Sequence, residues 1–223
     1  GNVIYSCAPN GTGVKKILTI QYNKKINNIS IGSNNKIAFS YHNNSTGADA
    51  IYRCYTSGSG LKFVDNGKSC FIYNNNYYYI KGTNIVCLTS SGMKKVICRN
   101  ISSDYSYIFA VTWRGIFYSD YPKAEARFCS FNGQKSRRIS WLAMADIHEL
   151  CVTDNYYYYE AYGVHGSAYD IIQVNLNNWQ ERTVATSVMG AKADNDYLYY
   201  NKHNSYGFYL ATYRRNLATM NCA

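Results

Sequence analysis

A short pattern recurs five times along the chain at an almost constant interval, and this period is the strongest constraint on the fold. Each copy has a turn residue, a spacer and then three apolar or aromatic residues. The copies occupy residues 35–39, 75–79, 114–118, 154–158 and 195–199. Their third residues are 40, 39, 40 and 41 positions apart. A period kept this closely indicates a repeat fold in which every unit is one supersecondary structure.

The residues around each copy predict β-strands. An apolar run precedes the copy, as at 70–72 and 107–110, and a β-rich run follows it, as at 85–87. A Gly or Asn turn and basic residues come after that second run. No segment has helical periodicity, and the abundant Tyr, Ile, Val, Phe and Thr suit half-buried pleated surfaces. We therefore expect four short strands per unit, named a to d in chain order.

Four antiparallel strands in about 40 residues are the dimensions of a β-propeller blade. A sandwich or an up-and-down barrel needs no such period, and the other repeats of this length are helical. First strands are expected near residues 26, 68, 105, 148 and 188, which gives an all-β, five-bladed propeller in a single domain over residues 1–223. Residues 3–19 hold a further c–d hairpin without a and b strands, so six blades with an incomplete first blade are the alternative.

Residues 76–96 resemble a blade of the YWTD-type propellers, the family named for the repeats of the LDL receptor. They begin Asn-Tyr-Tyr-Tyr-Ile-Lys-Gly, with Tyr-Tyr where the receptors have Tyr-Trp, as in bacterial members of the family. Residues 117–120, Phe-Tyr-Ser-Asp, are the only other stretch similar to Tyr-Trp-Thr-Asp. The resemblance extends over nearly the whole chain. It implies an extracellular or cell-surface binding module without catalysis, and it names no ligand.

The net charge of +10, from 23 Lys and Arg against 13 Asp and Glu, favours anionic partners. The basic residues recur near the start of each expected strand d: Lys15, Lys16, Lys62, Lys94, Lys95, Arg137, Arg138 and Arg182. Strand d is the outer edge of a blade, where charge blocks edge-to-edge pairing between molecules. We interpret most of the excess as such a rim, with an anion-binding face as the alternative, and expect no specific nucleic-acid partner.

Four of the eight cysteines follow the repeat too. Cys7, Cys54 and Cys129 each lie four residues before a turn glycine, and Cys87 is one residue off that place. Equivalent positions in different blades are too far apart for a disulfide, so we expect these four to be buried free thiols. The other four, Cys70, Cys98, Cys151 and Cys222, are less constrained, and one bridge among them is the alternative. No Cys or His spacing resembles a metal site, and we expect neither a metal nor a cofactor. No window approaches the apolar length of a membrane span.

The b–c and d–a connections of a propeller gather on one face of the disc, and the b–c connections hold the candidate ligand-binding residues. These are His42, Asn43, Asp120, Tyr121, His165, His203, Asn204 and Tyr206. Such side chains can hydrogen-bond hydroxyl groups and stack on sugar rings, and loops on a rigid scaffold often carry function. We therefore expect this face to bind a glycan or a protein ligand. The oligomeric state is left open.

Motifs for catalysis are missing from the sequence. It has no G-x-S-x-G elbow, no H-E-x-x-H motif and no phosphate-binding glycine loop. We therefore assign no catalytic residue and expect no enzyme. The alternative is a propeller glycosidase or lyase that acts on a polysaccharide, with a carboxylate pair drawn from Asp65, Asp104, Asp120 and Asp146.

Overall fold

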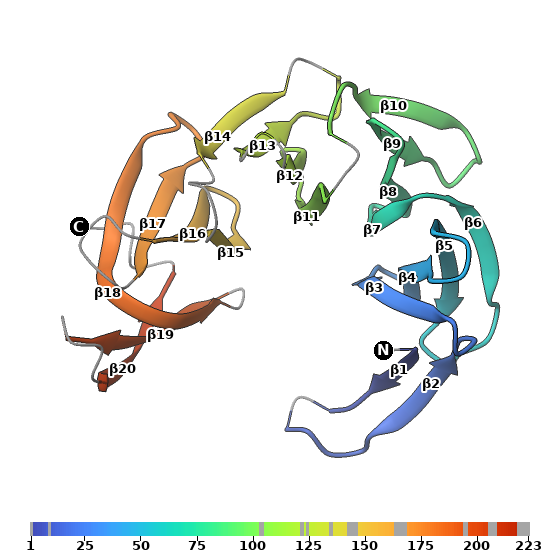
Figure 1. The fold of residues 1–223 in the computed structure, drawn as a ribbon, viewed down its shortest axis with the longest axis horizontal. Coiled ribbons are helices and arrows are strands. Elements are labelled where there is room, and N and C mark those ends of the chain that lie inside the picture. Colours follow the sequence, from blue (N-terminus) through green and yellow to red (C-terminus); the bar gives the residue numbers. More distant parts are fainter. Residues whose placement is uncertain are drawn as a thin grey trace. The chain divides into compact units, whose positions relative to one another are not determined.

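The computed structural model describes residues 2–8, 10–102, 105–120, 123, 125–133, 136–141, 147–162, 169–193, 196–204 and 209–217. The regular structure of these residues is β-strand in antiparallel sheets (Figure 1). By their contacts they divide into two units, Gly1–Pro122 with Phe128–Arg137, and Lys123–Arg127 with Arg138–Ala223. No helix in the described ranges is long and apolar enough to cross a membrane.

The chain begins with a two-stranded hairpin of β1 (Val3–Ser6) and β2 (Lys15–Thr19), as expected. Two four-stranded sheets follow. Sheet I consists of β3 (Lys24–Ile31), β4 (Lys36–Asn43), β5 (Ala48–Tyr55) and β6 (Lys62–Asn66). Sheet II consists of β7 (Lys68–Tyr73), β8 (Asn76–Lys81), β9 (Asn84–Leu88) and β10 (Lys94–Cys98).

Sheet III has the same strand order and consists of β11 (Tyr107–Val111), β12 (Ile116–Asp120), β13 (Glu125–Cys129) and β14 (Arg137–Trp141). In all three sheets the strands lie beside one another in chain order. The expected unit of four antiparallel strands is therefore confirmed. The expected basic residues open the outer strands β6, β10 and β14, at Lys62, Lys94 and Arg137.

The last strands depart from the expected pattern. They are β15 (Ile147–Val152), β16 (Tyr156–Tyr162), β17 (Tyr169–Asn175), β18 (Glu181–Ala193), β19 (Tyr197–His203) and β20 (Tyr209–Asn216), and they form one six-stranded sheet. The expected first strand near residue 188 is wrong as a separate element, because β18 runs through it. The register shifts between Met189 and Lys192, beside Gly190 with φ +71°. A bulge of this kind bends a strand without ending its pairing.

Asparagine pairs make the tight turns that start the central strands of sheets I and II. Asn34 and Asn35 have φ angles of 60° and 56°, and Asn74 and Asn75 have 47° and 61°. Two consecutive residues with positive φ are the type I′ turn, whose twist matches that of a hairpin. Each turn therefore fixes where its repeat copy enters β4 or β8.

Successive side chains of a strand point to opposite faces of its sheet, and one face of sheet I packs against sheet II. Ala38 and Ile51 are fully buried there and pack with Tyr77, Tyr79 and Val86 of sheet II. The opposite face of sheet I packs on the β1–β2 hairpin through a cluster that includes Ile4, Ile37, Phe39, Tyr41 and Cys54. Each fully buried Ile or Phe contributes about 1.5–3 kcal/mol through removal of apolar surface from water.

The far face of sheet II packs against sheet III in the same way. Tyr78, Ile80 and Ile85 form a cluster with Ile116 and Tyr118. Many of the tyrosines are thus core residues, and the largest fully buried side chains include Tyr79, Tyr118, Tyr157, Tyr158 and Tyr200.

The cysteines of the described residues have free thiols. Cys54, Cys87 and Cys129 are buried, as expected, and Cys7 is exposed, which corrects the expectation for that residue. Cys7 comes directly after the short strand β1, in the connection that leads to β2. Burial raises the pKa of the Cys54 thiol.

Candidate ligand-binding site

A cavity of about 320 Å³ lies between sheets I and II at the end that carries the b–c and d–a connections. Its lining residues are Asp49, Asn66, Gly67, Lys68, Ile80, Lys81 and Gly82. Asp49 is at the start of β5, residues 66–68 link β6 to β7, and residues 80–82 end β8. The cavity is therefore at the face that the sequence predicted for ligand binding.

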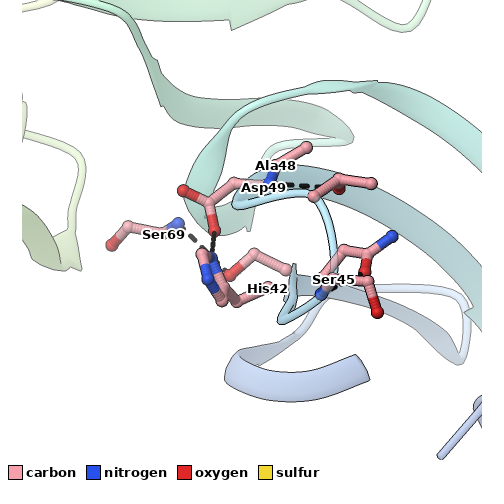
Figure 2. Close-up of polar contacts among 8 residues, drawn as sticks. His42, Ser45, Ala48, Asp49 and Ser69 are labelled. Carbon is pink, nitrogen blue, oxygen red and sulfur yellow. Dashed lines mark hydrogen bonds and ion pairs between the residues drawn. The ribbon is translucent and has the colours of Figure 1, made fainter. Parts of the chain in front are cut away.

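His42 and Asp49 form a cross-strand pair at the edge of this cavity. They are register partners on β4 and β5, and His42 Nδ1 lies 3.0 Å from Asp49 Oδ1 (Figure 2). Both side chains are partly exposed, at 38% and 28%. When Nδ1 carries a proton and donates it to the carboxylate, the neutral ring presents Nε2 as an acceptor. The pair thus offers acceptors of two kinds to a hydroxyl group.

The turn between His42 and Asp49 is held by its own side chains. Asn43 Oδ1 accepts a hydrogen bond from the amide of Ser45 at 3.0 Å, and Thr46 Oγ1 accepts one from the amide of Ala48 at 3.4 Å (Figure 2). Asn and Thr commonly stabilise turns in this way. Asn43 therefore shapes the turn beside the cavity.

Asp65 anchors Lys81, one of the residues that line the cavity. Its carboxylate accepts hydrogen bonds from the Tyr79 hydroxyl at 2.6 Å, Lys81 Nζ at 2.8 Å and the Asn66 amide at 2.9 Å, and Lys94 Nζ lies 2.8 Å away. Burial by itself raises the pKa of this carboxyl, but the bonds from Lys81, Lys94, Tyr79 and Asn66 hold it well below its usual range. Asp65 is therefore ionised at neutral pH and holds Lys81 at the cavity wall.

Gly67 allows the link between the two sheets to pass close to β8. Its φ angle is +154°, and an added Cβ would lie 2.6 Å from the carbonyl oxygen of Ile80 and 2.9 Å from the ring of Tyr79. A Cβ at this position would clash with β8, so its absence lets the two sheets approach each other beside the cavity.

The other predicted site residues lie elsewhere. Asp120 is buried at the end of β12, where its Oδ1 accepts a hydrogen bond from the Ser102 amide at 3.2 Å. His203 and Asn204 are in the second unit at the end of β19, and the His203 ring contacts Tyr209 edge to face at 5.9 Å between centroids. Tyr121, His165 and Tyr206 lie outside the described residues, as do Asp104 and Asp146.

Asp49, Lys68 and Lys81 line the cavity but were not predicted from the sequence as site residues. A signal for Asp49 was present, because a hairpin turn at residues 44–47 makes it the cross-strand partner of His42. Lys81 had no such signal, since its place depends on the packing of sheet II against Asp65 of sheet I.

The described part of the chain contains no group of three His, Cys, Asp or Glu side chains placed to hold a metal ion. The cavity is instead lined by a carboxylate, two ammonium groups and an Asn amide, and the imidazole of His42 contacts that carboxylate at the edge of the cavity. Such a set of donors and acceptors can hydrogen-bond the hydroxyl and carboxylate groups of a polar ligand.

No protein-family model and no curated protein sequence matches the chain. A chain of a nidogen/laminin complex is 11% identical with a TM-score of 0.57, over 97% of this chain and 86% of that one. The β-propeller domain of the Trilobed protease from Pyrococcus furiosus is 9% identical with a TM-score of 0.58, over 89% and 70%. Oligogalacturonate lyase from Vibrio parahaemolyticus is 6% identical with a TM-score of 0.60, over 97% and 72%. At these identities the likeness is one of fold alone, and the fold it shows for this chain is a β-propeller.

Proposed function

We propose that the chain is a non-catalytic binding module that recognises a glycan through the cavity between sheets I and II. The observation that carries the proposal is the cavity of about 320 Å³ that is lined by Asp49, Asn66 and Lys81, with His42 hydrogen-bonded to Asp49 at its edge. Adjacent hydroxyl groups of a sugar both donate and accept, so they fit a site that mixes a carboxylate with ammonium and amide groups.

The carboxylates favour binding over catalysis. Glycoside hydrolysis and related reactions need a pair of carboxyl groups free to face a substrate. Of the four candidates, Asp65 and Asp120 are both buried and already accept hydrogen bonds within the protein. The resemblance to YWTD-type propellers supports the same conclusion, and with it a location outside the cell or on its surface.

The proposal is tested by binding of the chain to an array of neutral and acidic glycans at low and at physiological salt. Selective binding that survives physiological salt supports it, because screening over about 8 Å removes diffuse surface attraction but not contacts in a cavity. Binding only at low salt, to every acidic glycan alike, contradicts it, and so does the absence of any binding.

Two substitutions locate the site. Asp49→Asn and His42→Ala should each lower the affinity for the selected glycan by about tenfold, the value of one lost hydrogen bond to a charged group. Asp154→Asn is the matched control, a carboxylate change at an exposed turn of the second unit. Equal affinity of all three variants would place the ligand elsewhere and overturn the assignment of the cavity.

A further inference from the structure

A second cavity of about 400 Å³ lies at the other end of the interface between sheets I and II. It is lined on sheet I by Lys36, Arg53, Tyr55 and Lys62, and on sheet II by residues that include Tyr77 and Ser90. None of its lining residues is acidic. Lys36 is six residues before His42 on β4, so the two cavities are about 20 Å apart along the strand.

The strand register of sheet I brings the side chains of Lys36, Arg53 and Lys62 close together. Arg53 is directly opposite Lys62 on the neighbouring strand, and Lys36 is opposite Tyr55, two residues further along β5. Strand alternation places all four side chains on the face that meets sheet II. Like charges directly opposite one another destabilise a sheet. The ion pairs of the described residues include none of these three cations.

The wall from sheet II supplies an aromatic ring and hydroxyl groups. Burial raises the pKa of Tyr77, and the positive charge of Arg53, which lines the same cavity, offsets part of this increase. Thr89 and Ser90 come from the c–d turn, and the Ser90 amide is fixed by Asn76 Oδ1 at 3.1 Å. On the sheet I side the Tyr55 ring is 40% exposed. An exposed ring beside hydroxyl groups suits the body of a sugar.

We propose that this second cavity binds a saccharide that carries a sulfate or phosphate ester, with the ester oxyanion among Lys36, Arg53 and Lys62 and the sugar ring against Tyr55. Arginine and lysine are the residues that bind such oxyanions, arginine through its planar fork of donors. A bound oxyanion also offsets the repulsion between Arg53 and Lys62. The site is separate from the glycan-binding cavity, at the opposite end of the same interface.

The test is calorimetric titration with a sulfated disaccharide, its phosphorylated counterpart and the unesterified sugar. Wild type should bind at least one of the two esters more tightly than the unesterified sugar. The double variant Arg53→Met with Lys62→Met should bind at least about 100-fold more weakly, since each charge-assisted contact is worth about tenfold. The matched control, Lys15→Met with Lys16→Met on β2, removes the same charge from an exposed strand and should change the affinity less than about twofold.

Thermal melting separates loss of binding from loss of folding. Without ligand, the Arg53→Met, Lys62→Met variant should melt no lower than wild type, because the like-charge pair is gone. An equal loss of affinity in the pocket variant and in the control variant would show that the overall positive charge of the chain attracts the ester, and this would overturn the proposal. The proposal would also be overturned if the unesterified sugar bound with the same affinity as the esters, or if none of the three saccharides bound. His42→Ala should leave this binding unchanged, so the two cavities are tested independently.

Discussion

Replacement of Asp65 by Ala removes the acceptor at the centre of the sheet I–sheet II contact. The two ammonium groups are on side chains that are 44% and 51% exposed, so screening limits each ion pair to about 0.5–1 kcal/mol. Tyr79 is fully buried, and its hydroxyl would lose its partner at a further cost of about 1–3 kcal/mol. We therefore expect the free energy of unfolding to fall by about 3 kcal/mol.

A double-mutant cycle with Tyr79→Phe isolates the buried hydrogen bond. Phe at position 79 removes the hydroxyl that Asp65→Ala leaves without a partner. The double variant should therefore be more stable than the sum of the single losses predicts, by a coupling of about 1–2 kcal/mol. Urea unfolding at pH 7, followed by far-UV circular dichroism, measures all four proteins. A loss below 1 kcal/mol for Asp65→Ala, or strictly additive losses, would refute this account.

The same carboxyl predicts a dependence on pH. Its pKa in the folded chain is lower than the value of about 3.9 for an unfolded chain, so its stabilising contribution is complete above about pH 4. That contribution is lost as the pH falls further, through the folded pKa. The stability difference between wild type and Asp65→Ala should stay constant from pH 8 to pH 5 and shrink below pH 4. A difference that grows in acid would contradict the assignment.

Two further predictions concern the backbone and the thiols. Gly58→Ala should cost more than about 2 kcal/mol of stability, because its Cβ would lie 2.3 Å from the Ile17 carbonyl oxygen, whereas Gly11→Ala, with a similar φ and no atom within 4 Å, should cost only about 1 kcal/mol. Urea unfolding compares the two, and equal losses would show that the contact with β2 is not tight. A disulfide reagent such as DTNB should label Cys7 rapidly in the native protein, and the buried thiols of Cys54 and Cys87 only after unfolding. Cys7→Ser should remove the fast phase that belongs to this thiol, and fast labelling that mass spectrometry maps to Cys54 or Cys87 would contradict their burial.

The positions of the strands could be predicted from the sequence because they follow from short-range rules. The central strands β4, β8, β12, β16 and β19 each begin within one residue of the third position of a repeat copy. The turns form at Asn pairs with positive φ, and the strands show alternating apolar residues. Both features depend only on a few neighbouring residues. The hairpin at the start of the chain and the basic residues that open β6 and β10 could be predicted for the same reason.

The contacts between strands and sheets were decided by the tertiary structure. Alternation shows which face of a strand is apolar, but not which sheet will cover that face or where a pairing will end. The sequence predicted Asp120 in a b–c connection, yet it is buried at the end of β12, where it accepts a hydrogen bond from the Ser102 amide. Asp65 and Lys81 meet only because sheet I packs on sheet II, and β18 continues past residue 188 because a bulge preserves its pairing. Sequence alone thus determined the repeat and its strands, whereas the two cavities depend on packing between whole sheets, whose free energy is summed over residues far apart in the chain.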